Sequence, residues 1–263
     1  MKEELSAFSI TSGLKTRFIG HKVFYYSELQ STMATAREKA LAGAAEGTVI
    51  IAGEQTAGKG RLDRRWVSPK GSINLSVILY PEPSDLPSLI MVASVAVVSA
   101  IESVAGLKAQ IKWPNDVLID GRKVCGILVE SWIANKNQTY AIIGIGINAN
   151  VRTASIGEVL APATSLSDEL GGEVSRLELV KRLMVEMERL YLLAKSSQDV
   201  YRQWRGSLIT LGKSVRASTG DAVYEGVAET VDEDGSLVIR LEDGSLKRFA
   251  AGDVTLQGCG RAD

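Results

Sequence analysis

The sequence predicts an α+β protein in which a larger domain of strands and helices precedes a small all-β domain. Strand-like and helix-like segments both occur as far as about residue 205, so the first domain contains both element types. After Gly212 the chain consists of short β-rich runs separated by glycine-containing turns. A chain of 263 residues is long enough for one large and one small domain that each bury a core.

These patterns divide the chain into an N-terminal arm at 1–21, a main domain at 22–210 and a C-terminal domain at 211–263. The last part holds several strands within roughly 50 residues, which is the size of an SH3-like β-barrel.

The first elements of the main domain have clear boundaries. Ser31 and Thr32 precede a helix-like run that stops near Gly43, and a hydroxyl residue in that place is typical of an N-cap. Segments rich in β-branched and aromatic residues predict strands at 23–29, 49–55 and 73–80.

Residues 86–105 are strongly apolar, and we interpret them as a buried helix. The uncharged part ends at Glu102 and contains Pro87 and three serines, so it is too short for a membrane span. Three strand-like runs follow, at 110–113, 123–131 and 139–148, with a turn at Asp120-Gly121. Apolar residues at helical spacing then predict the last helix of the main domain at 176–205.

Composition limits the chemistry that is available. The formal net charge is −1, so no general field favours nucleic acid or an anionic membrane. The single histidine, His21, gives no support to a multi-histidine metal site or a catalytic triad, and Cys125 and Cys259 form no CxxC motif. The N-terminus has acidic residues and no apolar run, which favours a cytoplasmic protein without a signal peptide. Catalysis would therefore use Lys, Arg, carboxylates and backbone amides.

The stretch GKGRLDRRW, residues 58–66, is the clearest local charge cluster. It places Lys59, Arg61, Arg64 and Arg65 directly after a predicted strand. Arginine binds phosphate or carboxylate through two parallel hydrogen bonds, and glycine lets backbone amides approach an anion. The spacing matches neither a P-loop nor a dinucleotide-binding fingerprint. An anion site of another kind and a solvated basic turn remain the two interpretations.

A second cluster is KWPNDVLIDGRKVCGILVE, residues 112–130. A hairpin here would hold Lys112 near Asp116 and bring Lys123 back beside them. Two lysines suit a polyphosphate, and a neighbouring carboxylate suits a divalent cation or an amine. The third motif, GIGINAN at 144–150, alternates glycine with apolar residues, which lets a ligand or another backbone come close and places Asn148 beside it.

Taken in this order, the Ser31-Thr32 pair, the three motifs and the small β-domain resemble biotin protein ligases over about residues 22–256. The resemblance implies a class II synthetase-like mixed sheet and a two-step reaction. Biotin and MgATP form biotinyl-5′-AMP and pyrophosphate, and a lysine of a biotin carboxyl carrier domain then attacks the mixed anhydride. It implies biotin, ATP and Mg²⁺ but no tightly bound prosthetic group, and it implies a homodimer.

The resemblance also assigns residues. The implied catalytic residues are Lys123, Arg61, Lys112 and Asp116, and Asp116 is also the implied metal ligand. The implied biotin contacts are Ser31, Thr32, Met33, Gln55, Lys59, Gly60, Arg61, Lys123 and Gly126. The implied ATP contacts are Gly58, Arg61, Arg64, Trp66, Lys112, Asn115, Asp116, Lys123 and Asn148.

Two departures from the usual family loop, GRGRxGRxW, stand out. Lys59 replaces an arginine and cannot form a planar fork, and Asp63 replaces a glycine and subtracts a charge. Only about 20 residues precede the catalytic domain, too few for a helix-turn-helix module, so we expect a short form without sequence-specific DNA binding.

Two other functions are alternatives to a biotin protein ligase. A lipoate or octanoate ligase shares the implied fold, but its RRxSGGG-type loop is missing, and an octanoyl transferase would need Cys125 as a nucleophile. A nucleic-acid-binding protein could use the C-terminal β-domain, but the DEDG and LEDG turns there are acidic and repel phosphate. We therefore expect no nucleic acid or membrane partner.

Overall fold

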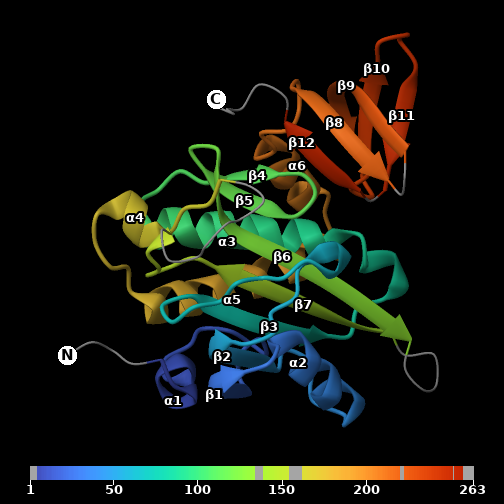
Figure 1. Ribbon diagram of the computed structural model, residues 1–263. Helices are drawn as coiled ribbons and strands as arrows, with labels where there is room; N and C mark the ends of the chain where they lie inside the picture. Colours follow the sequence, from blue (N-terminus) through green and yellow to red (C-terminus); the bar gives the residue numbers. More distant parts are fainter. Residues whose placement is uncertain (1–4, 134–138, 154–161, 220–221, 251, 257–263) are drawn as a thin grey trace.

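The computed structural model describes residues 5–133, 139–153, 162–219, 222–250 and 252–256, and its strands form two sheets (Figure 1). The large sheet has seven strands in the order β1-β2-β3-β7-β6-β5-β4. Its strands are β1 (Val23–Leu29), β2 (Val49–Gln55), β3 (Ile73–Leu79), β4 (Gln110–Lys112), β5 (Asp116–Ile119), β6 (Arg122–Ile133) and β7 (Thr139–Ile147).

The large sheet is mixed, as the resemblance to biotin protein ligases implies. β1 and β2 run parallel, and the remaining neighbours run antiparallel. The helices of this part are α1 (Ala7–Thr11), α2 (Thr32–Leu41), α3 (Ser88–Ala105), α4 (Leu166–Leu170), α5 (Arg176–Ala194) and α6 (Asp199–Gly206), with single 3₁₀ turns at Arg61–Asp63 and Pro83–Asp85.

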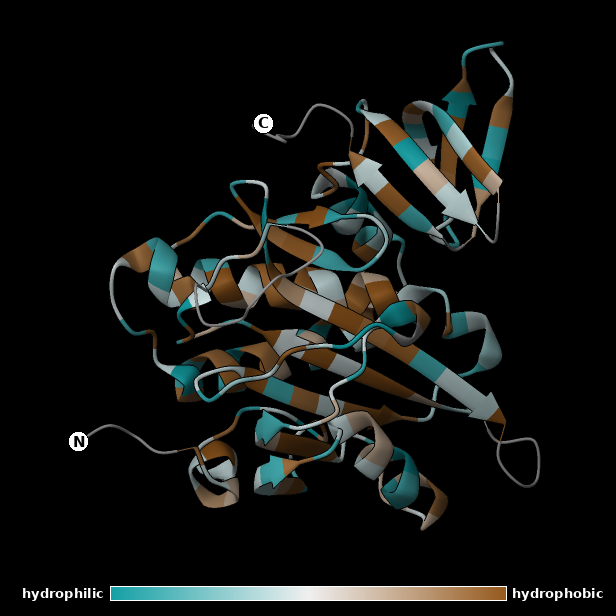
Figure 2. Ribbon diagram, viewed as in Figure 1, coloured by the Kyte–Doolittle hydropathy of each residue, from teal (hydrophilic) through white to brown (hydrophobic). Residues whose placement is uncertain are grey.

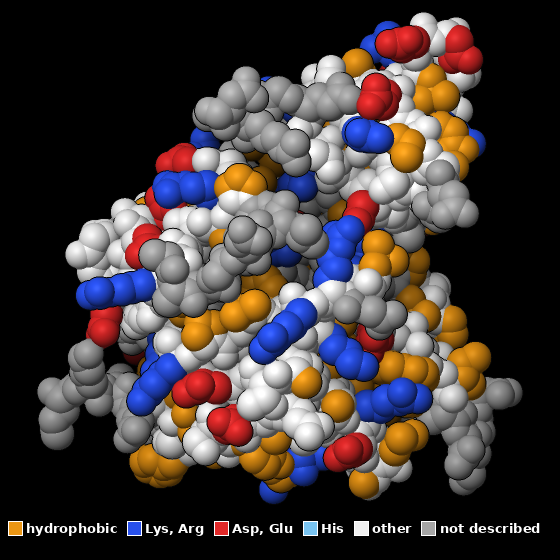
Figure 3. Space-filling view, viewed as in Figure 1, with side chains coloured by type: hydrophobic (Ala, Val, Ile, Leu, Met, Phe, Trp, Pro, Cys, Tyr) orange, Lys and Arg blue, Asp and Glu red, His pale blue; other side chains and the backbone are white. Residues whose placement is uncertain are grey.

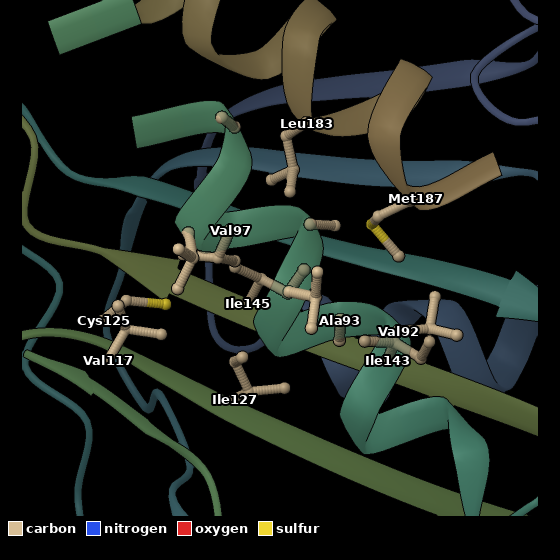
Figure 4. Close-up of a cluster of buried hydrophobic side chains, with 14 of the residues drawn as sticks. Val92, Ala93, Val97, Val117, Cys125, Ile127, Ile143, Ile145, Leu183 and Met187 are labelled. Atoms are coloured by element: carbon tan, nitrogen blue, oxygen red, sulfur yellow. The ribbon is translucent and has the colours of Figure 1, made fainter. Parts of the chain in front are cut away.

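One face of the large sheet carries the main core. Alternate strand residues such as Cys125, Ile143 and Ile145 are buried against α3 and α5 (Figure 4). Because successive side chains of a strand point to opposite faces, the residues between them face the other way. The core is therefore a layer of β-branched and aliphatic side chains between the sheet and two helices, which appears brown along α3 in Figure 2.

The opposite face of the sheet is covered only in part. Toward one end, Tyr140 and Ile142 of β7 pack with Met33 and Ala36 of α2 in a separate apolar cluster. Further along β7 the same face continues with Gly144 and Gly146. This face thus has an apolar part under α2 and a part made of small residues.

Helix α3 confirms the predicted buried helix. By length and composition it could cross a membrane, but 61% of the relevant window is buried inside the structure. It ends at Gly106, whose φ of 66° is the left-handed conformation that favours glycine at a helix C-terminus.

Two expectations for the main domain need correction. The segment expected to be one helix over 176–205 is two helices, because α5 ends at Ala194 and the Lys195–Gln198 linker separates it from α6. Serine at 196 and 197 favours a turn over a helix interior.

The second correction concerns residues 110–148, where three strands were expected and four are present, because 116–119 forms the additional strand β5. It pairs with β4 on one side and, through the Asp120-Gly121 turn, with β6 on the other.

The C-terminal part is an antiparallel sheet, as expected. Its order is β11-β10-β9-β8-β12, formed by β8 (Ser214–Thr219), β9 (Ala222–Val231), β10 (Leu237–Leu241), β11 (Leu246–Phe249) and β12 (Asp253–Leu256). Among the described residues the pairing runs from β11 to β12 without closing into a ring, so the SH3-like barrel of the expectation is represented here by an open five-stranded sheet.

Buried and partly buried hydrogen bonds join the two sheets near the β4–β5 turn. The backbone N–H of Trp113 donates to Thr210 Oγ1 at 2.9 Å, and its indole Nε1 donates to the carbonyl of Gly235 at 2.8 Å. Ile111 on β4 also exchanges backbone hydrogen bonds with Ser207 and Ile209. These contacts fix the C-terminal sheet against the 112–116 segment.

We predict that Trp113→Phe lowers the free energy of unfolding more than Trp204→Phe does. Both indoles are buried, but Trp204 Nε1 has no hydrogen-bond partner among the described residues. Both substitutions remove similar ring volume, while Trp113→Phe also leaves the Gly235 carbonyl unpaired, at a cost of about 1–2 kcal/mol. Equilibrium urea unfolding of the two variants measures the difference, and equal losses would contradict the role of this bond.

Candidate active site

A cleft of about 850 Å³ opens on the face of the large sheet that holds the small residues. Its wall is formed by seven segments: α2, the end of β2, residues 58–66 (the basic loop), the 112–116 segment, β6, β7 and the start of β12. Lysine and arginine side chains gather on this face of the molecule, below the C-terminal sheet (Figure 3). The lining contains two carboxylates, Asp116 and Asp253, and six cationic side chains: Lys59, Arg61, Arg64, Arg65, Lys112 and Lys123.

One end of the cleft is a network of neutral polar groups. Thr32 donates to Gln55 Oε1 from its backbone N–H at 2.8 Å and from its hydroxyl at 3.1 Å. Gln55 Nε2 donates to Ser68 at 3.0 Å, and Ser76 donates to the Thr32 hydroxyl at 2.9 Å. Ser31, the N-cap of α2, lies next to this network and lines the cleft. The network fixes the Gln55 amide and the Thr32 hydroxyl before any ligand binds.

The basic loop is a small hairpin that projects from the end of β2. Trp66 N–H donates to the Gly58 carbonyl at 2.9 Å, Gly60 N–H donates to the Arg64 carbonyl at 2.7 Å, and Lys59 and Arg65 form an isolated bridge. Leu62, at the tip, has a φ of 54° and an exposed side chain. The substitution of aspartate at 63 lies in this tip, but the Asp63 side chain falls outside the described part of the structure.

Two arginines tie the loop to other parts of the protein. Arg61 donates through Nη1 to Asn115 Oδ1 at 3.2 Å and through Nη2 to the Gly252 carbonyl at 2.9 Å. Arg64 forms an ion pair with Asp253. Burial holds the pKa of the Arg61 guanidinium below its ordinary value, while Asp253 and Asp116 oppose that shift. Arg61 still carries its charge at neutral pH, because the ordinary pKa of arginine is so high.

The two hairpins formed by β4, β5 and β6, within residues 110–133, bring Lys112, Asp116 and Lys123 together. Lys112 and Asp116 are register partners on β4 and β5, and Lys123 Nζ lies 2.6 Å from Asp116 Oδ1. The backbone of Lys123 is held by hydrogen bonds with Pro162 and Thr164. The sequence-based expectation that a hairpin would bring these three side chains together is confirmed.

Glycines on β6 and β7 form the floor of the cleft. A Cβ atom on Gly146 would lie 2.4 Å from Trp66 Nε1, and one on Gly126 would lie 3.0 Å from the same ring. A Cβ atom on Gly144 would lie 2.6 Å from Met33 Sδ. Trp66 and Met33 therefore lie directly on the sheet, which is the close approach that the GIGINAN motif predicts.

Two asparagines are fixed at the edges of this floor. Asn115 Nδ2 donates to the Ile127 carbonyl at 2.7 Å, and Asn148 Nδ2 donates to the Thr164 carbonyl at 3.0 Å.

Lys123 also contacts the Trp66 ring. Its Nζ lies 5.4 Å from the centre of that ring, close enough for a cation–π contact.

All the residues assigned from the sequence line this cleft except Gly58. Gly58 is buried at the base of the loop, where a Cβ atom would lie 2.5 Å from the Trp66 carbonyl oxygen. Sequence reasoning missed the contribution of Asp253, Val254 and Thr255 from β12. It also missed Ser68, before β3, and Ser76 on β3, which hold Gln55 and Thr32, because isolated serines carry no sequence signal.

The remaining candidate groups lie elsewhere or are unreactive. Cys125 is fully buried in the core, and burial raises the pKa of its thiol, so it is not poised as a nucleophile. His21 Nε2 lies 2.8 Å from the Thr16 carbonyl oxygen, away from the cleft. Within the described ranges, no cluster of three or more His, Cys, Asp or Glu side chains could hold a metal ion. Cys259 lies outside the described residues.

Comparison with known proteins gives consistent matches. Residues 25–148 match the biotin/lipoate A/B protein ligase family, and residues 210–256 match the biotin protein ligase C-terminal domain. The bifunctional ligase/repressor BirA of Bacillus subtilis is 36% identical over 259 residues, which cover 96% of this chain and 79% of that protein. A biotin–[acetyl-CoA-carboxylase] ligase of Paracoccus denitrificans is 34% identical, covering 73% of this chain and 83% of the relative.

A solved structure of a biotin protein ligase is also similar to this chain over most of its length. Biotin protein ligase from Aquifex aeolicus, in complex with biotin and ATP, superposes with a TM-score of 0.75 at 27% identity, covering 90% of this chain and 98% of the other.

We predict that Gly146→Ala displaces the Trp66 ring, since the added methyl group would overlap Nε1. The protein has four tryptophans, so an indole ¹⁵N NMR spectrum resolves four side-chain N–H signals at most. The signal that disappears in Trp66→Phe should shift in Gly146→Ala. Gly172→Ala, at a site with no atom within 4 Å of the new Cβ, should leave that signal in place. An unshifted signal in Gly146→Ala would rule out this packing.

Proposed function

This chain belongs to the biotin protein ligase family, and on that premise we propose how its cleft carries out the ligase reaction. The enzyme is a biotin–[acetyl-CoA-carboxylase] ligase that uses ATP to activate biotin and then transfers biotin to a carrier protein. The observation that supports the proposal most strongly is the pairing of a neutral polar end with six cations in one cleft. Biotin has a neutral ureido group at one end and a carboxylate at the other, so both ends find suitable partners.

The ureido group would lie at the polar end, against Ser31, Thr32 and Gln55. A ureido group has one strong acceptor and two N–H donors, and this end offers hydroxyl and amide groups of both kinds. The backbone of Lys59 and Arg61 lies on the same wall and can contribute, while the Gly60 N–H between them is bonded to the Arg64 carbonyl. Met33, Gly126 and Gly144 then border the acyl chain with apolar or small surfaces, so the carboxylate would point toward Lys123.

The carboxylate and the α-phosphate of ATP must meet although both are negative. Lys123, Lys112 and Arg61 converge where these groups would meet and supply positive charge that needs no reorganisation during the reaction. A carboxylate oxygen forms a bond to the α-phosphorus as the bond to the β-phosphate oxygen breaks and pyrophosphate leaves. The same cations then hold the phosphate of biotinyl-5′-AMP.

The nucleotide would extend from this point past Asn115 and Asn148, with Trp66 near the adenine and Arg64 at the phosphates. ATP enters as its Mg²⁺ complex, and in such substrates the phosphates and water supply most of the metal ligands. Asp116 is the carboxylate available to complete that coordination.

In the second step, the carrier lysine attacks the carbonyl carbon of the anhydride and AMP leaves with the shared oxygen. The attacking amine must lose a proton, and Asp116 is the carboxylate placed to orient the amine and accept that proton. Its 2.6 Å contact with Lys123 keeps it beside the reacting carbonyl.

We further propose the organisation of the enzyme. Residues 22–210 form the catalytic domain and 211–263 the C-terminal domain, a division supported by the separate sheets on the two sides of residue 210. The acceptor is the biotin domain of a carboxylase, and the enzyme works in the cytoplasm as a homodimer. The edge position of β1 in the large sheet leaves a strand available for such contacts. Sedimentation equilibrium tests the homodimer.

Pyrophosphate exchange into ATP tests the proposed reaction directly. Biotin, lipoate and octanoate are compared at equal concentration, and we expect exchange with biotin alone, because lipoate and octanoate have no ureido group to bind Thr32 and Gln55. Exchange supported by lipoate or octanoate would assign the chain to the sister reaction, whose loop motif is missing here.

We predict that Lys123→Ala lowers biotin-dependent adenylate formation by about 100-fold or more, the range for loss of a group that stabilises developing charge. The variant loses one cation and also leaves Asp116 unpaired beside the incoming anions. Single-turnover formation of biotinyl-5′-AMP measures the effect. Lys108→Ala, which removes an exposed lysine outside the cleft, is the control. A normal yield in Lys123→Ala would contradict the assigned role.

A further inference from the structure

We propose that Asp253, at the start of β12, is a positioning residue that latches the basic loop onto the C-terminal sheet. This proposal rests on the function proposed above and gives the C-terminal sheet a part in the first half-reaction. Asp253 would not touch biotin or act on the reacting atoms. It would act through Arg64 and, with the neighbouring Gly252 carbonyl, through Arg61.

The loop has few constraints of its own. Its backbone bonds close it into a hairpin at Gly58–Trp66 and Gly60–Arg64, but these bonds join the loop only to itself. Leu62 at the tip is 67% exposed, so its side chain adds little packing that would hold the tip in place. The angle between the loop and the cleft therefore depends on side-chain contacts.

The polar contacts that hold the loop from outside come from two places. Arg61 reaches Asn115 on the catalytic side, at 3.2 Å, and the Gly252 carbonyl on the C-terminal side, at 2.9 Å. Arg64 reaches Asp253, 189 positions further along the chain. One arginine thus spans both sides of the cleft mouth, and the other is held by a charged group of β12.

The charges around the cleft explain why an aspartate serves this purpose. Six cations crowd the lining, and among the described residues Asp116 and Asp253 are the carboxylates that line it. Asp116 is committed to Lys123 at 2.6 Å. Asp253 is therefore the anion that offsets the repulsion among Arg61, Arg64 and their neighbours while the loop is closed.

Strand β12 is held in place by its pairing with β8 and by a buried side chain. Asp253 pairs with Ser218 in the antiparallel β8–β12 ladder, and Val254 is buried. The C-terminal sheet is fixed to the catalytic side by the Trp113 contacts described above. The latch can therefore hold the loop at a set distance from the floor of the cleft.

Closure of the loop would retain biotinyl-5′-AMP until a carrier arrives. Arg64 is 52% exposed and Asp253 24% exposed, so the pair is partly screened by water. Loss of such a pair changes an equilibrium by roughly two- to fivefold. If Asp253 were instead a stand-in for phosphate that ATP displaces, its removal would tighten ATP binding. The two roles predict opposite signs.

The first experiment uses the protein without ligand, so it does not depend on catalysis. Trypsin cuts after Lys59, Arg61, Arg64 or Arg65 faster when the loop opens, because proteolysis follows the population of locally opened chain, and mass spectrometry identifies the cut site. We expect trypsin to cut the Asp253→Asn variant in this loop about two- to fivefold faster than it cuts the unmodified protein. Asp253→Glu, which keeps the charge, should restore slow cleavage. Glu242→Gln, which changes an exposed carboxylate in the turn between β10 and β11, should have no effect.

The second experiment measures release of biotinyl-5′-AMP from the intact enzyme by rapid filtration. Asp253→Asn and Arg64→Gln should each shorten the half-life by a similar two- to fivefold, and the double variant should be no faster than either single one. The KM for ATP should rise in the same variants. Arg61→Gly removes the contacts of Arg61 with Asn115 and with the Gly252 carbonyl, and it gives the reference value for a loop that is no longer held by Arg61.

The outcomes separate the two proposals. If the unmodified protein forms no biotinyl-5′-AMP, the proposed function fails, while the trypsin comparison still tests the latch. If the adenylate forms but Asp253→Asn leaves both loop cleavage and adenylate release unchanged, the latch is wrong. Tighter ATP binding in Asp253→Asn would also overturn it.

Discussion

The whole site depends on the absence of side chains along one face of two central strands. Gly126, Gly144 and Gly146 lie where β6 and β7 leave the apolar cluster under α2, and Trp66 and Met33 rest on them. On the other face of the same strands, Cys125, Ile143 and Ile145 are packed against α3. Because side chains alternate along a strand, β6 and β7 build the core with one set of residues and the floor of the cleft with the residues between them. A methyl group at Gly146 would push Trp66 away from that floor.

On this floor, chemistry is organised by charge. Neutral hydrogen-bonding groups from α2 and β2 collect at one end, and lysines and arginines from three separate segments collect at the other. Gathering so many cations is costly unless anions are present. Asp116 and Asp253 offset part of that repulsion in the free protein, and in our account a carboxylate and a triphosphate supply the rest, which makes the empty cleft selective for substrates with that charge.

Most of this could be predicted from local sequence. The strand at 23–29, the Ser31 cap and the Asp120-Gly121 turn are set by short-range patterns and appear where expected. The break between α5 and α6 was missed, because apolar residues resume at Val200 and Trp204 with helical spacing after the short polar linker at 195–198. The role of β12 was missed for another reason. Asp253 meets Arg64 only after the chain has folded across 189 positions, and no local pattern records that pairing.

The most direct test of the account is a crystal structure with a non-hydrolysable analogue of biotinyl-5′-AMP bound. We expect the ureido group against Thr32 and Gln55, and the acyl-phosphate link within hydrogen-bonding distance of Lys123 Nζ and the Arg61 guanidinium. Such a structure would show the neutral polar end of the cleft bound to the ureido group and the cationic end bound to the phosphate. An analogue bound in the reverse direction, or with its phosphate away from Lys123, would contradict the account.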